Sequence, residues 1–251
     1  MSGADALSGR VVVVTGASRG IGLATSRVLA AAGAKVALWA RGAIEVEAAA
    51  AELGERGLAV PVDVADPASV EAGVERVREA FGGIDVLVNN AAVGRLSPIA
   101  EVSQVDLRDQ IGINLEGPIH CIRAIVPEMR RRGGGDIVNL SSDSVLRPFP
   151  WLGIYAATKA ALETLSTALR AELAGDGIRV SLIRSGPALL SFAAGWDPET
   201  AALAFEAWQA GGHLDPACVL PPERIAEAIL FALTRPPEAS VETLDLRPRR
   251  K

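Results

Sequence analysis

The chain has 251 residues, of which 49% are apolar and 22% are charged, as is ordinary for a globular protein with a sizeable core. Its net charge of −5 and the lack of a long basic stretch argue against nucleic acid as a partner. Two widely separated cysteines exclude a disulfide framework, and no apolar run reaches the ~20 residues that span a bilayer. We therefore expect a soluble cytoplasmic protein with no metal site and no membrane partner.

Strand and helix patterns alternate along the chain. The valine run at 11–14 ends in a glycine-rich turn and indicates a strand buried on both faces of a parallel sheet. The alternation predicts right-handed crossovers and a doubly wound α/β sheet, a Rossmann fold, in one domain over residues 1–251. The predicted strands are 11–14, 36–40, 58–62, 86–88, 136–140 and 179–183, and the predicted helices are 21–32, 67–81, 107–131 and 155–173.

The segment from about 187 to 222 interrupts this alternation. Seven of the ten aromatic residues fall between Phe149 and Trp208. They favour either a helical excursion that covers the core or a small helical lid over an apolar pocket beside Tyr155. The sequence leaves these two interpretations open.

A glycine-rich turn, Thr15-Gly16-Ala-Ser-Arg-Gly20-Ile-Gly22, follows the first strand and opens a helix. Glycine allows the backbone to turn tightly and to approach a pyrophosphate, which then meets the free N–H groups of the helix N-terminus. This context predicts a dinucleotide-binding loop.

The residues at the end of the second strand predict which dinucleotide binds. An acidic residue at this position would accept hydrogen bonds from a ribose 2′-hydroxyl, but this chain has Ala40 followed by Arg41. A second cation, Arg19, lies in the glycine loop. Two guanidinium groups suit a 2′-phosphate, so we expect NADP(H) rather than NAD(H). The alternative is two solvated arginines.

Tyr155 is the only tyrosine of the chain, and Lys159 follows it by one helical turn. Residues i and i+4 share a helix face, so the ammonium is expected to stabilise a phenolate and lower the tyrosine pKa from about 10. Such a tyrosine can donate a proton to a carbonyl oxygen or remove one from an alcohol. Ser142 is expected at the end of the preceding strand, where it can hydrogen-bond the same oxygen. Ser141 and Ser144 compete with it, and only its spacing to Tyr155 favours Ser142.

These motifs together resemble the short-chain dehydrogenase/reductase family over nearly the whole chain. The resemblance implies a catalytic tetrad of Asn114, Ser142, Tyr155 and Lys159, with Asn114 holding a water that links Lys159 to solvent. Asn114 could instead bond to backbone, and Asp63, which matches the family's adenine contact, could instead cap a helix. The segment that steadies the central sheet matches Asn89-Asn90-Ala91-Ala92. The full set of implied cofactor contacts is Gly16, Ser18, Arg19, Gly20, Ile21, Gly22, Arg41, Asp63, Val64, Asn90, Ala91, Tyr155 and Lys159.

The chain departs from the family after the strand that ends at Ile183. The family usually has Pro-Gly and then a small hydroxyl residue near the nicotinamide carboxamide. Here the sequence is Arg184-Ser185-Gly186-Pro187, and Leu190 stands at the expected hydroxyl position, with Ser191 next to it. This leaves the nicotinamide contact open.

We therefore expect an NADP(H)-dependent carbonyl reductase or alcohol dehydrogenase that acts on a hydrophobic ketone or secondary alcohol. The substrate pocket is expected from residues 93–96, 144–151 and 189–214. Leu146, Phe149, Trp151, Phe192 and Trp196 are expected to make it predominantly apolar. The alternatives are a non-catalytic NADP(H)-sensing protein and an isomerase or dehydratase on the same scaffold. The family resemblance implies a homo-oligomer, most often a tetramer, packed through the helices near 107–131 and 155–173.

Overall fold

The computed structural model describes residues 5–188, 195–213 and 218–249. Within these residues, seven parallel strands form one sheet in the order β3-β2-β1-β4-β5-β6-β7. The strand order reverses between β1 and β4, which is where ligands bind in open α/β sheets. The strands are β1 (Val11–Thr15), β2 (Lys35–Ala40), β3 (Gly57–Pro61), β4 (Val86–Asn89), β5 (Gly135–Ser142), β6 (Ile178–Ser185) and β7 (Thr243–Leu246).

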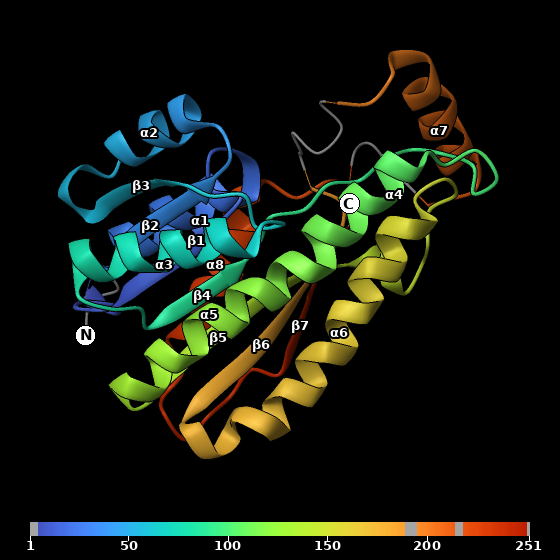
Figure 1. Cartoon of the computed structure of the whole chain (residues 1–251). Helices are drawn as coiled ribbons and strands as arrows, with labels where there is room; N and C mark the ends of the chain where they lie inside the picture. The colour runs from blue at the N-terminus through green and yellow to red at the C-terminus, as the bar shows by residue number, and fades with distance from the viewer. Residues whose placement is uncertain (1–4, 189–194, 214–217, 250–251) are drawn as a thin grey trace.

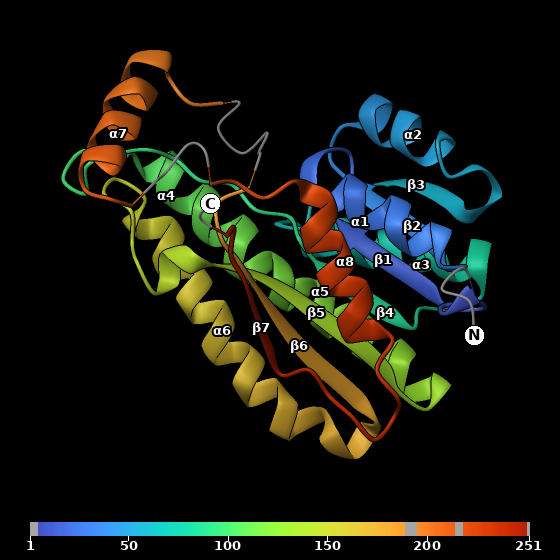
Figure 2. The ribbon, with the colours of Figure 1, turned by 180° about the vertical axis from the view of Figure 1, so that it is seen from behind.

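Helices cover both faces of the sheet. On one face lie α3, α5 and α6, and on the other lie α1 and α8 (Figure 1 and Figure 2). The predicted doubly wound fold is thus confirmed. The helices are α1 (Gly20–Ala31), α2 (Ala43–Ala51), α3 (Pro67–Phe81), α4 (Gln104–Ile111), α5 (Gly117–Arg132), α6 (Gly153–Leu173), α7 (Pro198–Ala210) and α8 (Pro222–Leu233).

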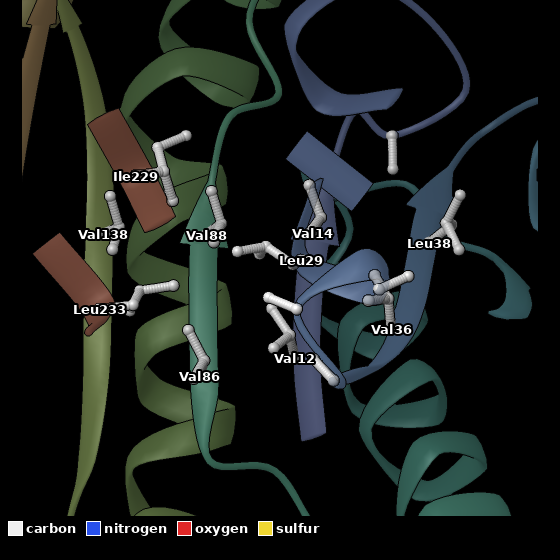
Figure 3. Close-up of a cluster of buried hydrophobic side chains, with 14 of the residues drawn as sticks. Val12, Val14, Leu29, Val36, Leu38, Val86, Val88, Val138, Ile229 and Leu233 are labelled. Atoms are coloured by element: carbon white, nitrogen blue, oxygen red, sulfur yellow. The ribbon is translucent and has the colours of Figure 1, made fainter. Parts of the chain in front are cut away.

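The two faces of β1 supply two separate cores. Val12 and Val14 pack with α1 and α8, where Leu29 and Ile229 are fully buried (Figure 3). Val11 and Val13 belong to the opposite core, with α3 and α5. Complete burial of a valine side chain stabilises a fold by roughly 1.5–3 kcal/mol relative to exposure, so this short strand anchors the whole sheet. The valine run is therefore buried on both faces, as predicted.

The helix predicted at 107–131 is observed as three pieces. A π-helical turn, Gly112–Glu116, joins α4 to α5 without a break in the chain's helical course. Such turns are rare and are frequent at functional sites. This one carries Asn114.

The segment between β6 and α8 contains α7, which lies beside α4 and away from the sheet (Figure 1). Strand β7 was not predicted. It pairs with β6 and adds a short edge strand, of which Leu244 and Leu246 are only partly buried.

Candidate active site

The glycine loop between β1 and α1 has a backbone that only glycine fits well. Gly16 and Gly20 have φ angles of 65° and 55°, in the left-handed region. A Cβ atom on Gly16 would lie 2.9 Å from Cα of Ala91, and one on Gly22 would overlap the carbonyl oxygen of Gly16. Arg19 gives α1 no side-chain cap, so the helix begins with N–H groups open to an anion.

The segment after β4 is bound to this loop. The Thr15 hydroxyl oxygen accepts hydrogen bonds from the backbone N–H groups of Asn90 and Ala91, both at 3.0 Å. In return, Nδ2 of Asn90 donates to the carbonyl oxygens of Thr15 (2.8 Å) and Gly16 (3.2 Å). These four bonds hold the glycine loop in place from the next strand along the sheet.

A cleft of about 570 Å³ runs along this edge of the sheet from the end of β2 to α6. At the β2 end it is lined by the exposed side chains of Arg19 and Arg41 and by Asp63. Asp63 does not cap α3, because Asp66 occupies the N-cap position and accepts from the N–H of Ala68. Instead, Asp63 accepts from the N–H of Ala65 at 3.0 Å.

The other end of the cleft holds the predicted catalytic tyrosine and lysine. Ser142 ends β5 and hydrogen-bonds the hydroxyl of Tyr155. Nζ of Lys159 lies 5.9 Å from the Tyr155 ring centroid and donates to the carbonyl oxygen of Leu140 at 2.8 Å. The structure therefore brings Ser142, Tyr155 and Lys159 together.

The prediction that the ammonium lowers the tyrosine pKa is wrong for this arrangement. Burial raises the pKa of Tyr155 to about 12; the hydrogen bond with Ser142 lowers it, and the charge of Asp143 raises it further. Burial also lowers the pKa of Lys159 to about 8. Because the Lys159 ammonium donates to a backbone carbonyl, the effect of burial on the pKa of Tyr155 outweighs any stabilisation of the phenolate by that ammonium.

The three candidate serines have different partners. Ser141 donates to Glu163 of α6 at 2.5 Å. Ser144 is buried, and its backbone N–H donates to Oγ of Ser142 at 3.2 Å. Among these three, the hydrogen bond to Tyr155 belongs to Ser142, so the geometry agrees with the choice made by spacing.

Asn114 is fully buried in the π-helical turn and binds the backbone on the other side of the cleft. Its side chain accepts from the N–H of Val93 and donates to the carbonyl oxygen of Val93, both at 2.8 Å. Its Nδ2 also lies 3.2 Å from Oγ1 of Thr158, the residue before Lys159. The backbone-binding alternative thus describes its hydrogen bonds, and its part in a water relay stays a prediction.

The aromatic residues of the 149–208 region pack mainly against one another. The rings of Phe149, Trp196 and Phe205 lie around Trp208, with centroids 5.1–5.9 Å from it. Two indole N–H groups fasten this cluster to loops beside Tyr155: Trp196 donates to Gly94 at 2.8 Å, and Trp208 to the carbonyl oxygen of Pro150 at 2.9 Å.

Residues 93–95 of the expected pocket line the 570 Å³ cleft, but Leu146, Phe149, Trp151 and Trp196 do not. Phe149 and Trp151 line a neighbouring apolar groove of about 480 Å³, which meets the cleft at Arg95. Leu146 is exposed, and Phe192 lies outside the described residues, as do Leu190 and Ser191.

Two polar residues of the cleft, Glu45 and Ser185, were missed in the sequence. Ser185 had a signal, since it stands where the family motif has proline. Glu45 had none, because a single charged residue in a helix's first turn resembles any solvated side chain. No helix within the described ranges is both long and apolar enough to cross a membrane.

Comparison with known proteins identifies the family. A model of the short chain dehydrogenase family matches residues 10–198. An uncharacterized oxidoreductase of Staphylococcus haemolyticus is 34% identical over 96% of this chain and 98% of its own length. The chain therefore belongs to the short-chain dehydrogenase family of oxidoreductases.

Other relatives differ in size and in bound cofactor. Glycine betaine reductase of Emericella nidulans is 35% identical over 97% of this chain, which spans 19% of that protein's length. An alcohol dehydrogenase of Thermococcus sibiricus, solved with 5-hydroxy-NADP, is 32% identical with a TM-score of 0.81, covering 96% of this chain and 98% of its own. A 3-ketoacyl-(acyl-carrier-protein) reductase of Brucella melitensis, solved with NADH, is 29% identical with a TM-score of 0.84, covering 96% and 97%.

Proposed function

We propose that this protein transfers a hydride between NADP(H) and a carbonyl or secondary alcohol, with Tyr155 as the general acid and base. The observation that carries the proposal is that Lys159 and Tyr155, which hydrogen-bonds Ser142, line one end of a cleft whose other parts are shaped by the glycine loop. Solved relatives bind NADP or NADH in the same fold, which supports a nicotinamide cofactor here.

The cleft fits a dinucleotide. A Cβ atom would fill the space at Gly16 and Gly22, where the backbone must approach a pyrophosphate. Arg19 and Arg41 would hold a 2′-phosphate, which guanidinium groups bind bidentately. The remaining proposed contacts come from Ser18, Gly20, Ile21, Asp63, Val64, Asn90, Ala91 and Lys159, and the bound nicotinamide would supply or accept the hydride.

The protein's own groups would manage the proton. With its pKa raised to about 12, Tyr155 is protonated at neutral pH and can donate to a carbonyl oxygen. Ser142 would donate a second hydrogen bond to that oxygen. Lys159, whose pKa is lowered to about 8, is mostly an ammonium at pH 7 and would stabilise the phenolate that proton donation leaves. We assign Asn114 to a water relay through which a proton from solvent would pass by way of Lys159 to the phenolate and restore Tyr155.

We propose an apolar ketone or its alcohol as the substrate. The groove lined by Phe149, Trp151 and Ile99 opens beside Arg95, next to the cleft, and would accept an apolar substituent. We further propose a homo-oligomer packed through α5 and α6, between which Ile122, Leu165 and other side chains line an apolar depression of about 290 Å³.

The test is consumption of NADPH and of NADH, followed by absorbance, across a panel of ketones of rising size and charge. We expect turnover with NADPH, a higher kcat/KM for NADPH than for NADH, and preference for apolar ketones. Tight NADPH binding without turnover on any carbonyl would overturn the enzymatic assignment, and preference for NADH would overturn the choice of cofactor.

A further inference from the structure

The end of β6 places a serine hydroxyl in the cleft beside the proposed catalytic groups. β5 and β6 pair in register, with Ser142 opposite Ser185, so both strands end in serine at the same level of the sheet. Ser185 is only 7% exposed and lines the cleft together with Tyr155 and Lys159. In the family motif this position is a proline, which has no such hydroxyl.

The hydrogen of the Ser185 hydroxyl is already used. Its Oγ donates to the carbonyl oxygen of Gly186 at 2.8 Å. The backbone of Gly186 is fixed as well. Its N–H donates to the carbonyl oxygen of Leu246 at 2.8 Å, and it packs closely against Pro248, since an added Cβ atom would lie 3.0 Å from Cδ of Pro248. A hydroxyl has one hydrogen and two lone pairs, so towards a ligand in the cleft Ser185 is an acceptor.

A ligand group that meets Ser185 must therefore be a donor. At this end of the cleft, opposite Arg41, a dinucleotide would present its nicotinamide. The carboxamide N–H₂ is the only nitrogen donor of that ring system. The ribose hydroxyls are the other donors nearby, but their oxygens would accept from the Lys159 ammonium, which favours α6 over the end of β6 as their place.

We propose that Ser185 binds the nicotinamide carboxamide by accepting a hydrogen bond from its N–H₂ group. The contact would orient the ring above the substrate from the end of β6. It would supply the hydroxyl that this sequence lacks at Leu190. This inference rests on the proposed function, because it needs a nicotinamide dinucleotide in the cleft.

The experiment compares the binding of NADP⁺ with that of its 3-acetylpyridine analogue, in which a methyl group replaces the amide nitrogen. Quenching of tryptophan fluorescence reports Kd for wild type and for Ser185→Ala. We expect wild type to bind NADP⁺ about five-fold more tightly than the analogue, the usual net value of one neutral hydrogen bond, and Ser185→Ala to bind both equally. Binding of 2′-phospho-ADP-ribose, which has no nicotinamide, should not change in the variant.

Ser181→Ala is the matched control, because Ser181 is buried in the same strand but does not line the cleft. It should keep the wild-type preference. If Ser185→Ala keeps the same preference, if wild type has none, or if the variant also loses 2′-phospho-ADP-ribose, the carboxamide contact is overturned. If wild type binds neither dinucleotide, the proposed function fails as well, so the two failures are distinguishable.

Discussion

Two neighbouring regions are built in different ways: the glycine-loop end of the cleft (the dinucleotide end) and the aromatic cluster around Trp208, which lies beside the cleft (the aromatic end). Around the glycine loop, backbone groups define the shape, and Thr15 and Asn90 fix it through hydrogen bonds between adjacent strands. Around α7, side chains from distant segments define the shape, as Trp196 and Trp208 reach across to the loops at Gly94 and Pro150. A backbone-defined site tolerates little change and serves one ligand. A side-chain-defined site can change with each aromatic residue, so we expect the choice of substrate to depend on this region.

This difference between the two regions predicts that the catalytic step can be abolished while NADPH binding is kept. Tyr155→Phe deletes the proton donor and little volume, so kcat should fall by about 10²–10⁴-fold. The Kd for NADPH, measured by fluorescence, should rise by no more than about five-fold, the usual net value of one neutral hydrogen bond. A variant that retains most of its kcat would show that Tyr155 is not the proton donor.

Changing the glycine loop should have the opposite effect. In Gly22→Ala, the new Cβ would overlap the carbonyl oxygen of Gly16 and lie 2.6 Å from Nδ2 of Asn90. We expect NADPH binding to weaken by at least about ten-fold, with a lower melting temperature, because a 1.4 kcal/mol strain already amounts to a factor of ten. Gly175→Ala is the control, since nothing lies within 4 Å of its added Cβ. Equal behaviour of the two variants would contradict the backbone-defined site.

Arg41 tests how the dinucleotide end distinguishes its ligands. Arg41→Ala should reduce the ratio of kcat/KM for NADPH over NADH by about ten-fold or more, the range expected for a lost charge-assisted hydrogen bond. Arg27→Ala removes a surface arginine that pairs with Glu52 at 2.6 Å, and it should leave the ratio unchanged. An unchanged ratio in Arg41→Ala would mean that this guanidinium is only solvated.

Lys159 gives a prediction for stability against pH. Burial lowers the pKa of Lys159 to about 8 in the folded protein, below its value of about 10.4 in the unfolded chain. Between these two values the unfolded chain binds more protons, so the contribution of Lys159 to the free energy of unfolding must rise with pH. Urea unfolding at pH 7 to 10 measures this. The free energy of unfolding of wild type, relative to that of Lys159→Met, should increase as the pH rises. A constant difference would contradict the lowered pKa.

The smallest effect is expected at the aromatic end. Trp208→Phe keeps most of the ring volume but loses the 2.9 Å hydrogen bond to Pro150. We expect KM for an apolar ketone to rise by about five-fold, the value of one hydrogen bond, while the Kd for NADPH stays the same. A change in NADPH binding instead would mean that the two ends are coupled.

The glycine loop and the pairing of Tyr155 with Lys159 could be predicted from the sequence, because each depends on residues that are close together in the chain. Gly16, Gly20 and Gly22 follow a buried strand, and the spacing of Tyr155 and Lys159 follows from the helix repeat. The aromatic end could not be predicted, since the ring packing between Phe149 and Trp208 is a tertiary contact between residues far apart in the sequence. The pKa of Tyr155 was mispredicted for the same reason: spacing gives the ammonium's position on the helix, but not its burial. That the whole chain forms one domain stays a prediction.

The π-helical turn at Gly112–Glu116 joins α4 to α5. A π turn contains one residue more than an α turn, so it takes up an extra residue while the helices on either side keep nearly the phase of one continuous helix. If the same residues were wound as a regular α-helix, α4 would be turned relative to α5, and Asp106 and Asp109, which ion-pair with Arg95 at 3.3 and 3.7 Å, would face a different direction. The turn thus accommodates one additional amino acid without moving the carboxylates that pair with Arg95.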